Sequence, residues 1–96
     1  LLNKRIIMGG TVRQQATRCT TTESNTLAAN DSRQHLIIQN ANGGAVYINL
    51  DDDTTPTEAA CSLELIDLEF IQIPNFTGSV KTSGNSDVKV RFLEFA

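Results

Sequence analysis

Two apolar runs separated by a short Asn/Gly segment dominate the hydrophobic pattern of this chain. The runs are Gln34–Asn40 and Ala45–Leu50, and Ala41-Asn42-Gly43-Gly44 lies between them. β-branched residues favour strands, whereas Asn and Gly favour tight turns. The pattern therefore predicts an antiparallel hairpin and a chain that is built mainly from strands and turns.

Further alternating or apolar stretches predict strands elsewhere in the chain. Val88, Val90 and Phe92 alternate with charged residues, which is typical of a half-buried strand. Other strands are expected at Ala16–Thr22, within Ser62–Ile73 and at Phe76–Thr82, and Ser83–Asp87 is expected to be a turn. About seven or eight short strands indicate an all-β fold. This is an antiparallel β-sandwich, jelly-roll or Ig-like, or a small β-barrel.

Two polar stretches are expected to connect these strands. Asn25–Ser32 is predicted to be a loop that is anchored by Leu27. Thr55, Pro56 and Glu58 have the spacing of a capping box, so one short helical turn is expected over Pro56–Ala60.

The segment Ser62–Ile73 is the most apolar part of the chain, and its pattern changes phase near Leu65-Ile66. A bulge or turn is expected there, followed by a strand in which Leu68 and Phe70 face the core and the acidic residues between them face solvent. The predicted core consists of Ile38, Val46, Ile48, Leu68, Phe70, Val90 and Phe92.

Length and charge narrow the possible classes of protein. The chain has 96 residues, which suits one domain, and we expect a single sandwich domain over residues 12–96. The net charge is −3 and the eight basic residues are scattered, so no nucleic-acid partner is expected. No apolar run approaches the roughly 18 residues of a membrane span, so no membrane partner is expected either.

Residues 1–11 are interpreted as an N-terminal arm or an edge strand. Five apolar side chains lie within eight residues, and Gly9-Gly10 follows them as a possible hinge. The apolar residues are Leu1, Leu2, Ile6, Ile7 and Met8. We predict that they contact another subunit or a capsid; the alternative is a strand in the chain's own sheet.

The ionisable residues form no recognisable catalytic set. Asp51, Asp52 and Asp53, together with Glu58, offer oxygen ligands for Ca²⁺, but their spacing is not that of a calcium loop. We therefore expect a solvated acidic loop that contacts a basic partner. His35 is the only histidine, and no nucleophile motif is present. No metal, no cofactor and no enzymatic activity are expected.

Three other side chain types leave alternatives open. Tyr47 either packs across strands or stacks on a sugar, as the exposed aromatic residues of lectins do. Arg33 is expected to pair with a carboxylate at the edge of the hairpin, in a structural role. Cys19 and Cys61 either form a disulfide or remain two small apolar residues.

At Arg33–Leu50 and at the C-terminal strand, the chain resembles a family of small tailed-phage virion proteins. That family shows an Arg-x-x-Leu-x-Ile-Gln-Asn strand, a turn and a Val-Tyr-Ile strand. The matching residues are Arg33, Leu36, Ile38, Gln39, Asn40, Val46, Tyr47 and Ile48. The resemblance covers Arg33–Ala96. It departs from the family at Cys61–Leu65, which lacks the glycines common there.

The resemblance implies a non-enzymatic virion protein, and first of all a head-decoration (cement) protein on the outside of a phage capsid. Its partner would be the major capsid protein or another virion protein. Its own state would be a homo-oligomer, with a trimer favoured. Its location would be the virion, after assembly in the host cytoplasm. The alternative is a receptor- or carbohydrate-binding module of a tail or fibre. The resemblance assigns no catalytic residue.

Overall fold

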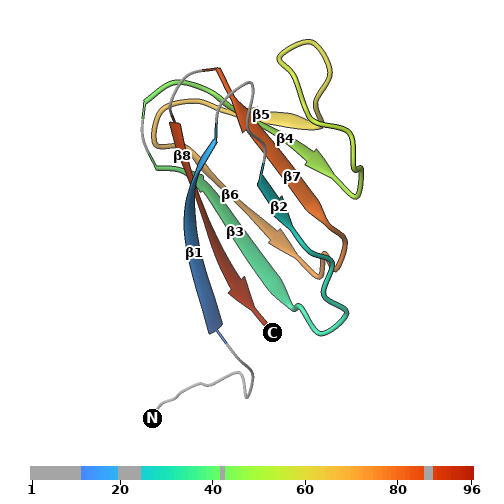
Figure 1. The fold of residues 1–96 in the computed structure, drawn as a ribbon. Helices are drawn as coiled ribbons and strands as arrows, with labels where there is room; N and C mark the ends of the chain where they lie inside the picture. Colours follow the sequence, from blue (N-terminus) through green and yellow to red (C-terminus); the bar gives the residue numbers. More distant parts are fainter. Residues whose placement is uncertain (1–11, 20–24, 42, 86–87) are drawn as a thin grey trace.

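Eight β-strands form the regular structure of this computed structural model, which describes residues 12–19 (backbone only), 25–41, 43–85 and 88–96 (Figure 1). The strands are β1 (Val12–Cys19), β2 (Asn25–Leu27), β3 (His35–Asn40), β4 (Val46–Leu50), β5 (Leu63–Leu65), β6 (Phe70–Pro74), β7 (Val80–Gly84) and β8 (Val88–Phe95). Among the described residues, every regular element is a strand.

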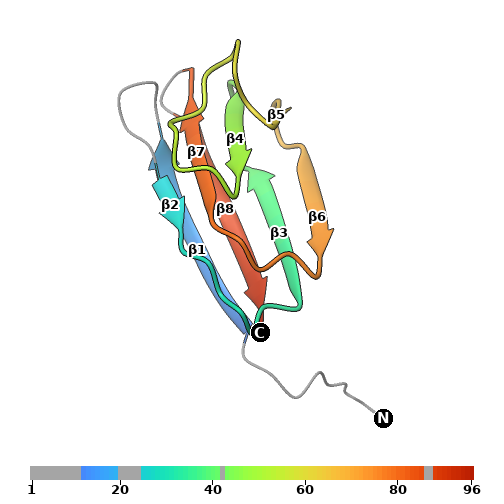
Figure 2. The same cartoon turned by 90° about the vertical axis from the view of Figure 1, so that its right-hand side faces the viewer.

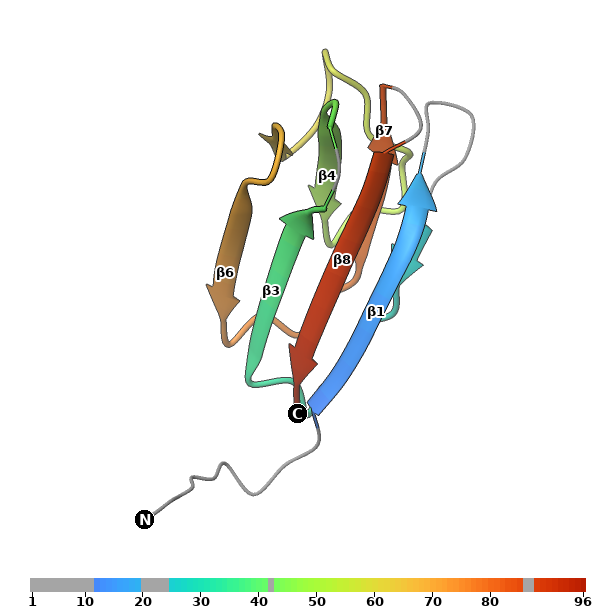
Figure 3. The same ribbon diagram turned by 90° about the vertical axis from the view of Figure 1, so that its left-hand side faces the viewer.

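The strands form two four-stranded antiparallel sheets that face each other (Figure 2). One sheet has the order β1-β8-β3-β6 (Figure 3) and the other β2-β7-β4-β5. The pairs β4–β5, β3–β6, β2–β7 and β1–β8 are nested in sequence and alternate between the sheets. This is the order obtained when one long hairpin folds over on itself, the jelly roll. The predicted all-β sandwich is confirmed, and the strand order is that of the jelly-roll alternative. The antiparallel hairpin predicted from Gln34–Asn40 and Ala45–Leu50 is wrong, because β3 pairs with β6 and β8 in one sheet whereas β4 pairs with β5 and β7 in the other.

The core lies between the inner faces of the two sheets. Side chains of β3 and β8 alternate between buried and more exposed positions, as expected for strands with one face in the core. Its buried apolar residues are Leu27, Leu36, Ile38, Val46, Ile48, Leu65, Val80, Val88, Val90 and Phe92. Five of the seven predicted core residues are therefore confirmed: Ile38, Val46, Ile48, Val90 and Phe92.

Leu68 and Phe70 were predicted in the core, and that prediction is wrong. The expected turn is present, because the Glu69 N–H donates to the Ile66 carbonyl oxygen at 2.9 Å. This turn sets the phase of β6 so that Ile71 and Ile73 pack against the core. Leu68 lies in the turn and Phe70 points to the opposite face of the strand. A change of one residue in phase thus moves a whole set of side chains to the other face.

Three strand boundaries also differ from the sequence expectation. β1 begins at Val12, before the expected Ala16–Thr22, and part of the loop expected at Asn25–Ser32 forms β2, where Leu27 is buried as expected. β7 is Val80–Gly84 instead of Phe76–Thr82. Cross-strand pairing decides these limits. β7 pairs with β4 from Val80 to Gly84, which places Ser83 and Gly84 in a strand despite their preference for turns.

The helical turn expected over Pro56–Ala60 is absent. Thr57 and Ala60 instead exchange two backbone hydrogen bonds, of 3.0 and 3.1 Å, across a tight turn. The Ser83 hydroxyl donates to the Pro56 carbonyl oxygen at 2.5 Å and holds the loop over the sheet. The tight turn and the hydrogen bond from Ser83 of β7 thus replace the helical turn that the capping signal indicated.

Residues 1–11 and 20–24 lie outside the described residues. The arm or edge strand expected at Leu1–Thr11 is therefore not described, and it stays a prediction. Cys61 is a free, half-buried cysteine. Among the described residues, no helix is long and apolar enough to cross a membrane.

Candidate functional site

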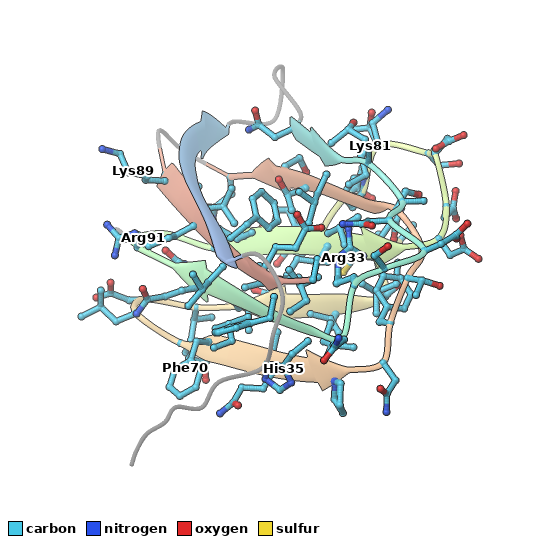
Figure 4. All side chains as sticks on the ribbon, turned by 90° about the horizontal axis from the view of Figure 1, so that it is seen from below. Arg33, His35, Phe70, Lys81, Lys89 and Arg91 are labelled. Carbon is cyan, nitrogen blue, oxygen red and sulfur yellow. The ribbon has the colours of Figure 1, made fainter. Side chains whose placement is uncertain are left out.

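The most unusual surface of the described structure is an apolar edge formed by Ile66, Leu68 and Phe70. These side chains are 55%, 60% and 57% exposed, and they are the large hydrophobic residues that are mostly exposed among those described. Phe70 projects outward from β6 in Figure 4. We call these three residues the apolar edge. Exposed hydrophobic residues that cluster in this way mark interaction sites more often than isolated ones do.

Leu68 occupies a backbone conformation that leucine seldom adopts. Its φ is 64°, in the left-handed region. For a non-glycine residue this conformation costs about 1–2 kcal/mol. Asp51 and Asn75 also have positive φ, but Asp and Asn tolerate it better than a bulky apolar residue does. The chain thus accepts backbone strain in order to place an exposed leucine at the tip of this turn.

The apolar edge adjoins the open side of the first sheet. β6 is the last strand in the described order β1-β8-β3-β6. The Asn40 N–H bonds to the Glu69 carbonyl oxygen, and the Asn75 N–H bonds to the Gln34 carbonyl oxygen. In an antiparallel ladder of this register, the backbone groups of Phe70 and Gln72 point away from β3. Pro74 has no N–H, which restricts further pairing to the other part of β6.

At the end of the sheet that lies opposite the apolar edge, the buried Arg33 side chain forms hydrogen bonds with three segments of the chain. The Arg33 Nε donates to Glu94 Oε2 at 2.7 Å, and both side chains are almost completely buried. Its Nη1 donates to the carbonyl oxygens of Phe76 (3.1 Å) and Gly78 (2.8 Å), and its Nη2 donates to that of Ala28 (2.7 Å). We call these contacts the Arg33 network. Figure 4 shows Arg33 enclosed within the ribbon.

The Arg33 network joins the β2–β3 loop, the β6–β7 loop and β8. The expectation that Arg33 pairs with a carboxylate is confirmed, but the pair is buried, and β3 and β4 form no hairpin at whose edge it could lie. Asn40 has a similar structural role, because its amide donates to the carbonyl oxygens of Gly44 (2.9 Å) and Leu65 (3.0 Å). The polar residues of the resemblance motif at these two positions therefore satisfy buried backbone groups.

The acidic loop of Asp51, Asp52 and Asp53 is exposed. The Asp52 carboxylate accepts the Thr54 N–H at 2.8 Å, and this hydrogen bond lowers the pKa of Asp52 below its ordinary value of 3.8. The Lys81 Nζ donates to the Asp53 carbonyl oxygen at 3.0 Å. Among the described residues, no group of three His, Cys, Asp or Glu side chains could hold a metal ion. The structure thus places the three carboxylates where a partner could reach them.

Tyr47 lies on the outer face of β4 and is covered by the loop that precedes β5. Only 3% of it is exposed. Burial raises the pKa of its phenol above the ordinary value of 10.0, and the Glu58 carboxylate raises it further. A cavity of about 170 Å³ beside it is lined by Tyr47, Pro56, Thr57, Glu58, Ser83 and Asn85. A ring covered to this extent has no face available for stacking on a sugar.

Among the described residues, the remaining sequence candidates do not converge on a site. The His35 Nε2 lies 3.2 Å from Gln72 Oε1, and the His35 ring contacts Phe95 edge-on at 5.8 Å between centroids. The five apolar residues Leu1, Leu2, Ile6, Ile7 and Met8 lie outside the described residues. The sequence analysis missed the apolar edge. A signal was available, because Glu64, Asp67 and Glu69 alternate irregularly with the apolar residues of this segment.

Comparison with known proteins gives no relative for this chain. No protein-family model, no curated protein and no solved structure matches it significantly.

Proposed function

We propose that this chain is a non-enzymatic virion structural protein that binds the outside of a phage capsid and stabilises it. Jelly rolls are common among viral capsid proteins and lectins. The strand order supports this class of protein, but a fold alone does not assign a function. The proposal also depends on the resemblance at Arg33–Ala96 and on the distribution of polar groups described above.

The observation that carries the proposal is the burial of the residues that form the resemblance motif. Leu36, Ile38, Val46 and Ile48 are completely buried, and Arg33 is 2% exposed. Residues in such positions specify a scaffold, so the chemistry must come from the surface. The described surface offers the apolar edge and an acidic loop, which suit protein–protein contact better than catalysis.

The alternative, a carbohydrate- or receptor-binding module, has less support. Sugar-binding sites use exposed aromatic rings, but the only tyrosine of the chain is covered and the chain has no tryptophan. Phe70 is exposed, but it belongs to an edge whose neighbours Ile66 and Leu68 are aliphatic.

Electron microscopy of phage particles with and without this chain tests the proposal. We expect additional density that repeats over the outer surface of the head, and heads without the chain should release their DNA at a lower temperature. Density confined to the tail would overturn the decoration role and favour the receptor-binding alternative. Absence of the chain from purified particles would overturn both.

Adding purified variants back to heads that lack the chain tests the acidic loop. The triple variant Asp51→Asn, Asp52→Asn, Asp53→Asn removes three charges, and Asn tolerates the positive φ at position 51. We expect weaker binding and a weaker dependence on salt. The control is the double variant Asp31→Asn, Glu64→Gln, which removes two exposed carboxylates outside this loop. Equal binding by both variants would exclude the loop from the contact.

A further inference from the structure

We propose that the apolar edge and the adjoining side of β6 receive the N-terminal segment Leu1–Met8 of a second copy of this chain. The segment would add as a strand to β6 and cover the exposed side chains. This inference does not depend on the proposed function, because the contact forms between copies in the absence of any capsid.

The acceptor surface has the three features that strand addition requires. Backbone groups of Phe70 and Gln72 point away from β3. Beyond β6, the described part of the sheet has no further strand. Ile66, Leu68 and Phe70 provide apolar surface next to this edge. Strand addition uses the backbone groups for affinity and the side chains for specificity.

The donor segment is complementary to this surface in both polarity and charge. Ile6-Ile7-Met8 is apolar and begins with two β-branched residues, which favour an extended strand. Lys4 and Arg5 precede it directly. The acceptor carries the exposed carboxylates of Asp67 and Glu69 within the apolar edge itself. The basic residues and the apolar run of the donor segment can thus contact the acidic and the apolar residues of the acceptor, respectively.

Chain length indicates that the donor comes from a second copy. β1 begins at Val12, and in the sheet order it is separated from β6 by three strand spacings, about 14 Å. Phe70 lies a further four residues along β6 from the row that contains Val12, so the two Cα atoms are about 20 Å apart on a flat sheet. Even fully extended, Met8 reaches only about 14 Å from Val12, and Ile7 about 18 Å. A strand added beyond β6 would lie four strand spacings from β1, about 19 Å, so in its own chain neither Ile7 nor Met8 reaches a position that pairs with β6.

The strained backbone of Leu68 is an independent sign that the edge has a role beyond folding. A glycine or asparagine would suit the φ of 64° better, and Leu68 is 60% exposed, so its side chain does little for the monomer. A contact with a second copy would bury it. The variant Leu68→Asn should therefore leave the melting temperature of the isolated domain unchanged or slightly raised, while it weakens self-association.

A complementation experiment tests the proposal. One variant lacks residues 1–8 and keeps the acceptor; the other carries Leu68→Asn with Phe70→Ser and keeps the donor. Light scattering after size-exclusion chromatography measures the mass of each alone and of the mixture. We expect the parent chain to self-associate and each variant alone to be monomeric, with association weakened at least about 100-fold by loss of the two apolar side chains. The mixture should form a one-to-one complex.

Two controls keep the result interpretable. Far-ultraviolet circular dichroism and thermal unfolding of each variant show whether it is folded. Lys89→Ser with Arg91→Ser alters exposed residues of β8 on the same sheet and should leave association unchanged. A monomeric parent chain, variants that associate as strongly as the parent, or a mixture that stays monomeric would each overturn the proposal. A deletion variant that unfolds would instead assign the segment to its own sheet, and would also overturn it.

Discussion

The two ends of the first sheet reverse the usual distribution of polar and apolar groups. At one end, the guanidinium of Arg33 and the carboxylate of Glu94 are buried and 2.7 Å apart. At the other end, Ile66, Leu68 and Phe70 are more than half exposed. Charged groups are seldom buried unless they are paired, and large apolar side chains seldom cluster on the surface of a monomer.

The two ends differ in whether their side chains form hydrogen bonds with the backbone. Arg33 donates hydrogen bonds to carbonyl oxygens in two loops that have no strand partner of their own, at Ala28 and at Phe76 and Gly78. A buried carbonyl oxygen that is left without a donor costs about 1–3 kcal/mol. The apolar edge satisfies no such need within the monomer. The first region is explained by folding, whereas the second requires a partner.

Replacing Arg33 should have one of the two largest effects on stability. Arg33→Met keeps the length of the side chain but removes the ion pair and the donors to the loop carbonyl groups, so we expect a loss of about 3–5 kcal/mol in the free energy of unfolding. Arg33→Lys keeps the charge but lacks the planar guanidinium group. Its free energy of unfolding should therefore lie between those of the parent protein and Arg33→Met. Urea denaturation measures both. Equal stability of all three proteins would show that the network contributes little.

Phe92 and Phe70 compare the two faces of the sheet with the same substitution. Phe92 is 1% exposed, so Phe92→Ala should lower the free energy of unfolding by about 3–5 kcal/mol. Phe70 is 57% exposed, and Phe70→Ala should change it by about 0.5 kcal/mol or less in the monomer. Denaturation below the concentration of any self-association gives both values. Similar losses in the two variants would mean that the phase of β6 is assigned incorrectly.

Gly78 tests how closely the loops at the Arg33 end pack. A Cβ at this position would lie 2.9 Å from Asp51 Oδ1 and 2.9 Å from Phe76 Cζ. Both atoms belong to side chains and Asp51 is exposed, so they can shift, and Gly78→Ala should destabilise the protein by about 1 kcal/mol. Gly43→Ala is the matched control, because a Cβ there has nothing within 4 Å, and it should be neutral or stabilising by up to about 1 kcal/mol. Thermal unfolding of the two variants should thus shift in different directions.

Replacing Tyr47 should have the smallest effect on the free energy of unfolding, and this effect should depend on pH. Its pKa in the folded protein is raised above 10.0, so the unfolded chain releases the phenolic proton first. The contribution of Tyr47 to stability is complete below pH 10 and is lost as the pH rises through the folded pKa. Because the chain has one tyrosine, phenolate absorbance reports this group directly. Tyr47→Phe should show a smaller decrease in stability above pH 10; an identical decrease in both proteins would assign it to other groups.

Much of the fold could be predicted from local patterns. The apolar runs Gln34–Asn40 and Ala45–Leu50 and the alternation from Val88 to Phe92 correspond to β3, β4 and β8 in the structure, although β3 and β4 belong to different sheets and do not form the predicted hairpin. In β3 and β8, a period of two residues follows directly from the geometry of a strand with one buried face, whereas β4 is buried on both faces. The same rule failed for Leu68 and Phe70. The apolar pattern indicated a turn near Leu65-Ile66, but it did not show that Leu68 lies in this turn in the left-handed region and that the turn sets the phase of β6.

The sequence by itself determined that the chain is all-β, where most of its strands lie, and that Arg33 would pair with a carboxylate. Only the tertiary structure decided the jelly-roll order of the strands, the burial of the Arg33–Glu94 pair and the exposure of the apolar edge. The physical reason is the range of the interactions. Strand propensity and alternation are set by neighbouring residues, whereas Arg33 and Glu94 are 61 residues apart and the limits of β7 depend on its pairing with β4. Such contacts exist only once the two sheets have packed.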